Sequence, residues 1–365
     1  MPWFAGGGVE VAKCNLPVSS GVRLRHAVAC FSQAGPWAQK FRSKGGIIHS
    51  LARPGEAQRF WNPFLFFRFL RLVRNLRPDL LVGCMFEGTL YAQLASRLLG
   101  IPYVHEDHWD PSVSHGWLAR WNHLSATRQA KLCVTVSENA ARYLRKALAI
   151  PRKKIRVIRN PCRIFPPFSH RFVVAAKKKL GLEADLPVIG TCCRLDDRHK
   201  RVSDLLRAVG KLSQPLQILI VGDGKDRAML EDLAKKACRR HRVIFAGYRT
   251  DHRNFLASMD IFVSVPAYEA MGIAVAEAMA AALPCIVSKV GGLLELIRPS
   301  LKNSYGRVVA PCAPLALSKK IKELIDSPSD RRLLGNRARR RALKLFQAEF
   351  HRHAVCEAYL KAAAF

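Results

Sequence analysis

Short apolar runs alternate with longer amphipathic segments along most of the chain. Runs of the buried-strand type occupy residues 132–136, 186–190, 217–221 and 261–265, and helical patterns separate them. A continuous apolar run of this length between turn signals is typical of a strand in a parallel sheet. Strands that alternate with helices imply parallel sheets with right-handed crossovers. The pattern therefore predicts the α/β fold class, and 365 residues suit two domains.

The first third of the chain follows the same alternation. Its expected elements are strands at residues 24–31 and 46–51, a helix within 59–79, a turn at 87–88, a helix at 90–99 and a strand at 101–104 that runs into the loop HEDHWD at 105–110.

The most informative stretch is YEAMGIAVAEAMAAALPCIVSKVGG, residues 268–292. It predicts a loop, a helix that starts near Met271 or Gly272, a turn, a buried strand and a loop at Gly291-Gly292. The first N–H groups of that helix lack intrahelical partners and carry partial positive charge, so a phosphate fits there.

Two glutamates, Glu269 and Glu277, stand eight positions apart in this stretch. On a helix that spacing is roughly 12 Å along the axis. A glycosidase pair needs about 5 to 9.5 Å, so the two do not suit acid and base work on one bond. They suit the two ends of an extended ligand with an anionic middle, such as a nucleotide-sugar. The alternative is an ordinary amphipathic helix with two solvated glutamates.

This stretch resembles the E-x7-E signature of the retaining glycosyltransferases of family 4, the glycosyltransferase group 1 domain. Residues 269–273 and 277–280 stand where that family has E-G-[FM]-G-[IL] and E-A-M-A, with Ala270 as the departure. The resemblance implies that Glu269 contacts the hydroxyls of the donor sugar and that Glu277 contacts the ribose. It also implies that the backbone of Met271, Gly272 and Ile273 meets the sugar and the diphosphate.

The segment from 186 to 206 resembles the family's G-R-L-x-x-x-K-G pattern. The resemblance implies that Arg194 and Lys200 neutralise the donor diphosphate. Arg201 replaces the usual glycine and shares that role as a candidate, while surface charge in a very basic protein is the alternative. Tyr248 and Arg249 occupy the loop that lies beside the nucleotide base in the family.

A glycine triplet near the start, Gly6 to Gly8, matches the family's loop after the first strand. The resemblance implies that Gly7 and Gly8 approach the donor diphosphate, and a flexible terminus is the alternative. Almost no strand precedes them, because residues 1–4 are few and include a proline, so the first strand is expected to be short or missing.

The HEDHWD loop carries a histidine, His108, at the family's offset from the preceding strand. The resemblance implies that His108 lies beside the donor sugar, with His105 as the competing candidate. Glu106, Asp107 and Asp110 are candidates to bind acceptor hydroxyls, and a surface acidic loop is the alternative.

The resemblance implies the GT-B architecture, which is two facing Rossmann-like, doubly wound parallel-sheet domains with a cleft between them. The expected parts are an acceptor-binding domain at residues 1–165, a nucleotide-sugar-binding domain at 166–345 and a terminal helix at 346–365 that crosses back to the first domain. The family needs no bound metal, so neither a metal site nor a cofactor is expected, and the nucleoside-diphosphate sugar is a co-substrate.

The formal net charge is +33, and both halves contribute. Residues 1–165 hold 25 Lys and Arg against 8 Asp and Glu (+17), and the remaining residues hold 35 against 19 (+16). This charge predicts attraction to an anionic surface: a membrane, a nucleic acid or a phosphorylated substrate. Residues 59–79 carry arginines at 68, 71, 74 and 77 among phenylalanines and leucines, which suits an interfacial helix or a core-packed helix with solvated arginines.

Further features of the sequence indicate the cellular compartment of the protein. The sequence has neither a stretch of 18 apolar residues nor a signal-peptide pattern, and its 11 scattered cysteines indicate reduced thiols. Adjacent Cys192 and Cys193 are expected to be small buried residues rather than metal ligands. We expect a cytoplasmic protein, peripheral on the inner face of the cytoplasmic membrane.

The sequence thus predicts a retaining hexosyl- or related glycosyltransferase that builds lipopolysaccharide or another cell-envelope glycan, with a glycan or glycolipid acceptor and no nucleic-acid partner. The alternatives are a nucleotide-sugar epimerase on the same fold, a basic nucleic-acid-binding protein, and an inactive relative, which Ala270 and the short first strand would suit.

Overall fold

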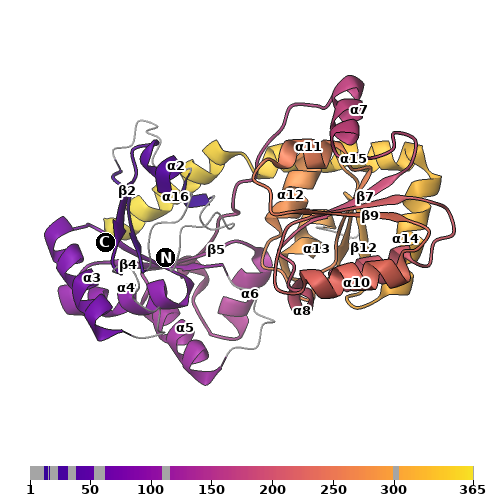
Figure 1. The fold of residues 1–365 in the computed structure, drawn as a ribbon. Coiled ribbons are helices and arrows are strands. Elements are labelled where there is room, and N and C mark those ends of the chain that lie inside the picture. Colours follow the sequence, from indigo (N-terminus) through magenta and orange to yellow (C-terminus); the bar gives the residue numbers. More distant parts are fainter. Residues whose placement is uncertain are drawn as a thin grey trace. The chain divides into compact units, whose positions relative to one another are not determined.

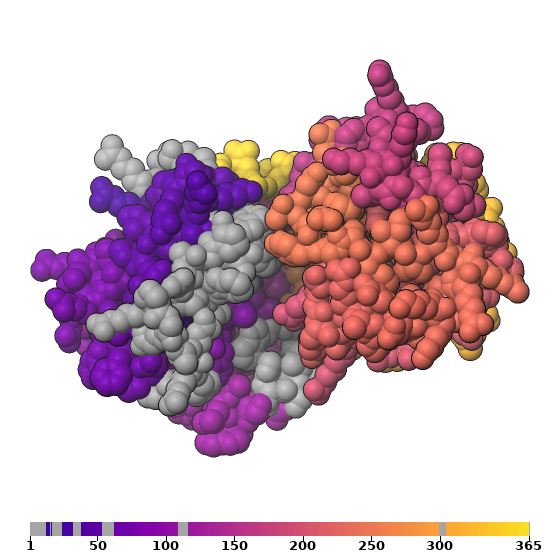
Figure 2. All heavy atoms as spheres, in the orientation of Figure 1, coloured from indigo at the N-terminus to yellow at the C-terminus, as the bar shows by residue number. Residues whose placement is uncertain are grey.

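The computed structural model describes residues 12–14, 16, 24–31, 38–52, 62–108, 116–298 and 304–364, which are coloured in Figure 1 and Figure 2. Gly7, Gly8 and Asp110 lie outside the described residues. The chain divides into two compact units: residues 1–161 with 348–365 form the first, and residues 162–347 form the second.

The first unit is built on parallel strands (Figure 1). Within its described residues, β1 pairs with β2, and β3, β4, β5 and β6 form a four-stranded sheet in that order. The strands are β1 (Ala27–Cys30), β2 (Ile47–Ser50), β3 (Leu81–Cys84), β4 (Tyr103–Asp107), β5 (Leu132–Thr135) and β6 (Ile155–Val157); the α-helices are α2 (Ala38–Arg42), α3 (Pro63–Leu76), α4 (Met85–Leu99), α5 (Trp117–Gln129), α6 (Glu138–Lys146) and α16 (Ala348–Ala363).

Helix α3 has clear start and stop signals. The Asn62 side chain accepts hydrogen bonds from the N–H groups of Phe64 and Leu65, and Pro63 occupies the first turn. Arg77 ends the helix in the left-handed conformation, with φ of 44°. The side chains that pack into the core of the first unit are those of Leu65, Phe66, Phe69, Leu70 and Val73. The apolar face of this helix is therefore core-packed.

The last helix, α16, belongs to the first unit and contacts β4. Val355, Ala358 and Tyr359 of the helix pack with Val104 and Val134 of the sheet. Residues from the two ends of the sequence thus share one core.

The second unit is a six-stranded sheet with the order β12-β11-β10-β7-β8-β9, and its strand pairs are parallel. The strands are β7 (Val188–Cys192), β8 (Gln217–Val221), β9 (Arg242–Gly247), β10 (Ile261–Ser264), β11 (Cys285–Ser288) and β12 (Arg307–Val309); the helices are α7 (His170–Lys179), α8 (Asp197–Lys200), α9 (Val202–Val209), α10 (Arg227–Ala237), α11 (His252–Ala257), α12 (Ile273–Ala280), α13 (Gly291–Ile297), α14 (Pro314–Asp326) and α15 (Pro328–Leu345).

This strand order is the Rossmann order, in which the third, second, first, fourth, fifth and sixth strands lie side by side. The direction of winding reverses between β7 and β10. Open α/β sheets bind ligands at such a switch point, outside the carboxyl ends of the strands. A ligand site is therefore expected at the loops that follow β7 and β10.

Three local predictions were wrong. Strand β4 extends to Asp107, because the polar side chains of its last residues find partners inside the protein. Helix α4 starts at Met85, so Glu87 and Gly88 lie in its first turn instead of a separate turn. Gly291 and Gly292 begin helix α13 rather than a loop.

Gly222 and Gly100 differ in what a side chain would cost: replacing Gly222 adds a steric clash to backbone strain, whereas replacing Gly100 adds backbone strain alone. Gly222 follows β8 with φ of +137°, and a Cβ there would lie 1.8 Å from the Cys193 carbonyl oxygen. Gly100 ends α4 with φ of +69°, and its Cβ would meet no described heavy atom within 4 Å. We expect Gly222→Ala to destabilise its unit by about 3 kcal/mol or more and Gly100→Ala by about 1 kcal/mol. Urea denaturation of both variants tests this, and equal losses would contradict it.

Candidate active site

Two loops of the second unit are tied together at the switch point. The segment after β7 contributes His199, whose carbonyl accepts a hydrogen bond from Ala267 N–H at 2.8 Å. The His199 ring stacks on Tyr268 with a centroid distance of 4.0 Å, and its Nε2 lies 2.9 Å from the Tyr268 carbonyl oxygen. The loop before α12 is therefore held against α8.

Lys200 and Glu269 meet at this junction. The Lys200 Nζ lies 2.7 Å from a carboxylate oxygen of Glu269, and both side chains are half-buried. Arg201 turns away and donates two hydrogen bonds to Asp204, at 2.9 and 3.0 Å. Arg194, in the loop directly after β7, is exposed. Lys200 rather than Arg201 is thus the cation beside Glu269.

Helix α12 begins directly after this pair. Its first residue follows Gly272, which has φ of +88° and where a Cβ would lie 2.2 Å from a methyl group of Leu293. Only glycine fits such a position without rearrangement. Met271, which precedes Gly272, is buried. The Gly292 N–H donates to the Glu269 carbonyl oxygen at 3.0 Å, which fixes the loop before the helix.

Glu277 lies in the second turn of α12 and is buried. One of its carboxylate oxygens is 2.8 Å from His252 Nδ1, and the other is 3.8 Å from Arg163 Nε. His252 Nε2 donates to the carbonyl oxygen of Arg249 at 3.0 Å. The loop with the exposed Tyr248 and with Arg249 is therefore connected to Glu277.

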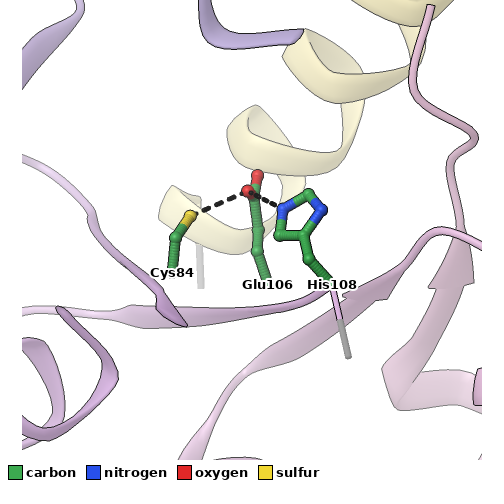
Figure 3. Close-up of side chains that lie close together, drawn as sticks. All are labelled: Cys84, Glu106 and His108. Atoms are coloured by element: carbon green, nitrogen blue, oxygen red, sulfur yellow. Dashed lines mark hydrogen bonds and ion pairs between the residues drawn. The ribbon is translucent and has the colours of Figure 1, made fainter. Parts of the chain in front are cut away.

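In the first unit, His108 follows the last residue of β4. Its Nε2 lies 3.2 Å from Oε2 of Glu106, which also accepts a hydrogen bond from the Cys84 thiol at 2.9 Å (Figure 3). A carboxylate only accepts hydrogen bonds, so Nε2 carries a proton. His108 Nδ1 is buried with no hydrogen-bond partner among the described residues.

Glu106 is the centre of a buried network that reaches both ends of the chain. Its Oε1 lies 2.6 Å from Nζ of Lys13 and accepts a hydrogen bond from the Tyr359 hydroxyl of α16, the pale yellow helix in Figure 3. Burial raises the pKa of Glu106, but Lys13 and the hydrogen bonds from His108 and Cys84 outweigh it and hold the pKa well below the usual range. Glu106 is thus ionised at neutral pH.

The predicted acceptor role of Glu106 and Asp107 does not fit these positions. Both residues lie in β4, are only 4% exposed and bond to partners inside the protein, since Asp107 lies 3.2 Å from His123 Nε2. The alternative of a surface acidic loop fails there for the same reason. His105 is also buried in β4, and side chains alternate along a strand, so it faces away from His108.

No local sequence pattern indicates several of the partners in these sites. Lys13 and Tyr359 stand 346 positions apart, and no local pattern relates them. His252 stands 25 positions before Glu277, in a segment that carries no motif.

The buried His351 and the half-buried His26 make the first unit sensitive to acid. Burial, with a contribution from Lys13, lowers the pKa of His26 and His351 to about 4. An unfolded histidine has a pKa of about 6.5, so the folded form is favoured above that pH, and this stability is lost as pH falls from about 6.5 to 4. In that window we expect each histidine to lower the free energy of unfolding by up to about 1.4 kcal/mol for each unit that the pH falls. Denaturation midpoints at pH 7 and pH 5 test this, and His351→Gln should flatten the dependence.

Family models match both parts of the chain. The model described as "Glycosyltransferase Family 4" matches residues 18–163, and the model described as "Glycosyl transferases group 1" matches residues 174–341.

Curated relatives match at moderate identity. The chain is 29% identical over 187 residues to an uncharacterized glycosyltransferase, MJ1607, of Methanocaldococcus jannaschii, covering 49% of this chain and 48% of the relative. It is 29% identical over 210 residues to the lipopolysaccharide core biosynthesis glycosyltransferase LpsE of Rhizobium meliloti, covering 58% of each. The match thus spans about half the length of these relatives.

A solved structure has the same fold over nearly the whole chain. The structure of Anabaena Alr3699/HepE in complex with UDP and glucose superimposes with a TM-score of 0.82 at 20% identity, covering 97% of this chain and 95% of that one. The two Rossmann-like units and this likeness confirm the GT-B fold. With family models matched to both parts, the chain belongs to the group 1 glycosyltransferases of family 4.

Proposed function

We propose that the protein transfers a hexose or related sugar from a nucleoside-diphosphate sugar to a hydroxyl acceptor, with retention of configuration. The observation that carries this proposal is the Lys200–Glu269 pair at the switch point, directly before the start of α12. A cation, a carboxylate and helical N–H groups are together suited to a sugar that is linked to phosphate.

Each part of a nucleotide-sugar has a candidate partner in the second unit. Glu269 takes the sugar hydroxyls, and Lys200, Arg194 and the start of α12 at Gly272 take the diphosphate. Glu277 takes the ribose, with Tyr248 and Arg249 beside the base. Lys200 leaves Glu269 for phosphate when the donor binds. The complex of HepE with UDP and glucose supports uridine as the base.

The chemistry follows from charge stabilisation. As the bond to the anomeric carbon breaks, negative charge grows on the diphosphate, and fixed cations and N–H groups stabilise it without a metal ion. No protein nucleophile is assigned; the departing phosphate takes the proton of the acceptor hydroxyl on the same face of the sugar. In the first unit His108, with Nε2–H held by Glu106, offers Nδ1 to the hydroxyls of the reacting sugars.

The acceptor is proposed to be a lipopolysaccharide core or another cell-envelope glycan. The likeness to LpsE supports this choice. The charge of +17 on residues 1–165 suits a phosphorylated acceptor.

Incubation of the purified protein with a panel of nucleotide-sugars and a phosphorylated core oligosaccharide tests the activity. NMR of the product should show a new glycosidic bond with the anomeric configuration of the donor. Conversion of the donor sugar without any acceptor would support the epimerase alternative, and an inverted product would contradict retention.

Helix α3 carries an outward stripe that suits a membrane surface. Phe64 and Phe67 are 71% and 65% exposed, and the exposed Arg71 and Arg74 continue the same face. Aromatic side chains that enter the headgroup boundary beside arginines that meet anionic lipid are the features of an interfacial helix. We propose that this stripe docks the protein peripherally on the inner face of the cytoplasmic membrane. No helix within the described residues has the length and apolar character to cross a membrane.

Vesicle sedimentation tests the docking. We expect the protein to pellet with vesicles that contain phosphatidylglycerol, and Phe64→Ser with Phe67→Ser to weaken binding at least about tenfold, since two buried aromatic side chains contribute well over 1.4 kcal/mol. Leu315→Ser, at a site 63% exposed in the second unit, is the control and should bind normally. Equal binding by all variants would assign the attraction to charge alone.

A further inference from the structure

Strand β4 presents ionisable side chains on both of its faces. On one face, Glu106 pairs with Lys13, so a built-in ammonium compensates its charge. On the other face, His105 and Asp107 stand two residues apart and therefore point the same way. His123 of α5 meets them there.

The three side chains on this second face form a compact group. Their ligand atoms all lie within 4.8 Å of one another, and His123 Nε2 is 3.2 Å from Asp107 Oδ2. His105 and Asp107 are each 4% exposed. Two imidazole nitrogens and a carboxylate oxygen are thus already gathered before any ion arrives.

A small cavity of about 10 Å³ lies at this group. It is close to the smallest volume that holds a single water or ion. Among the described residues that line it, none is Lys or Arg, and Asp107 supplies a carboxylate. This cavity therefore has the polarity for a cation.

His105 adds an independent sign of a missing partner. Its Nδ1 lies 3.3 Å from the Tyr103 hydroxyl and 3.5 Å from the Thr89 hydroxyl, while Nε2 is buried with no hydrogen-bond partner among the described residues. A buried nitrogen without a partner is destabilising, and polar groups behind a ligating histidine are what a metal site requires.

We propose that His105, Asp107 and His123 bind one divalent metal ion, with zinc favoured by the ligand chemistry. Two histidines and a carboxylate are a common zinc set, and the fourth position is left to water. The ion would join α5 to β4 and so stabilise the strand that ends at His108.

The neighbouring group of Cys84, Glu106 and His108 is a useful contrast. Its ligand atoms are equally close, but Lys13 already neutralises the carboxylate, and burial raises the pKa of the Cys84 thiol far above neutrality. We therefore assign the ion to the Asp107 side only. The proposed ion takes no part in sugar transfer, so this inference stands independently of the proposed function.

The experiment uses tag-free protein, loaded with zinc and then dialysed. We expect one equivalent of zinc per chain and visible d–d absorption of tetrahedral cobalt after exchange. Asp107→Asn and His123→Gln should bind zinc at least about 100-fold more weakly. The control is His49→Gln, because His49 also has a buried Nε2 without a partner among the described residues but lies in β2. It should bind zinc like the wild type.

Thermal melting separates loss of metal from loss of fold. Zinc should raise the melting temperature of the wild type and of His49→Gln, and EDTA should reverse the rise. His123→Gln should melt like the EDTA-treated wild type with or without zinc. If the wild type retains no zinc and its melting temperature is unchanged by zinc and EDTA, the cavity holds a water molecule and the proposal is wrong. Equal zinc binding by the variants would overturn it too.

Discussion

Replacement of Lys200 by alanine should lower kcat/KM for sugar transfer by about 100- to 1,000-fold, the usual cost of losing one group that stabilises developing negative charge. Lys200 is the cation that touches Glu269 at the start of α12, at 2.7 Å. Its loss removes the cation that we propose for the departing diphosphate and takes this ammonium away from the half-buried Glu269 carboxylate. Both effects oppose donor binding and bond breaking.

Steady-state kinetics with a donor and an acceptor measure this effect. Lys211→Ala is the matched control, because Lys211 is an exposed lysine that follows α9 in the same unit, and it should keep nearly full activity. Lys200→Arg should recover part of the loss, since the charge remains but the geometry changes. Near-normal transfer by Lys200→Ala would remove this lysine from the donor site.

Glu106→Gln should destabilise the first unit by about 3 to 5 kcal/mol, because it leaves the Lys13 ammonium buried without its counter-ion. It should also lower kcat by about 100-fold or more, since the charged carboxylate beside His108 becomes an amide with one accepting oxygen and one donating NH2 group. The pKa of Glu106 is held well below its usual range. The stability that this carboxylate supplies is therefore present above a pH of about 4.3 and is lost as pH falls further.

A double-mutant cycle separates the ion pair from general damage. Lys13→Met with Glu106→Gln should be less destabilised than the sum of the two single variants, because neither then leaves a buried charge. Nucleotide binding should be unchanged in all three, since Glu277, Tyr248 and Arg249, the partners that we propose for the nucleoside, lie in the second unit. Additive losses of stability would show that the two residues do not form the pair described.

The sequence predicted those parts of the molecule that local pattern controls. An apolar run predicted the buried strand at residues 217–221, and the structure has a strand there. The glycine at 272 marked the start of a helix, and α12 begins directly after it. The fold class and the family also followed from motif and alternation, because parallel α/β units repeat one local unit. The roles of Glu269 and Glu277 stay predictions.

Local sequence patterns did not predict the contacts between segments that lie far apart in the chain. HEDHWD reads as an acidic loop, yet the strand continues to Asp107 because Lys13, Tyr359 and His123 supply partners on its two faces. Polarity normally indicates a loop, and only the folded structure shows that these carboxylates have hydrogen-bonding partners inside the protein. The position of Arg201 was beyond the pattern for a similar reason, since its side chain donates to Asp204 and Lys200 is the cation beside Glu269.

The central claim, a donor site built around Glu269 and Glu277, is tested most directly by thermal stability against a panel of nucleotides and nucleotide-sugars. A ligand at about 100 times its dissociation constant should add about 2.7 kcal/mol to the wild type. We expect one nucleoside diphosphate, with UDP first, to raise the melting temperature, and Glu277→Ala to lose most of that rise. If no nucleotide shifts the melting temperature while DNA or RNA does, the donor site is not where we place it.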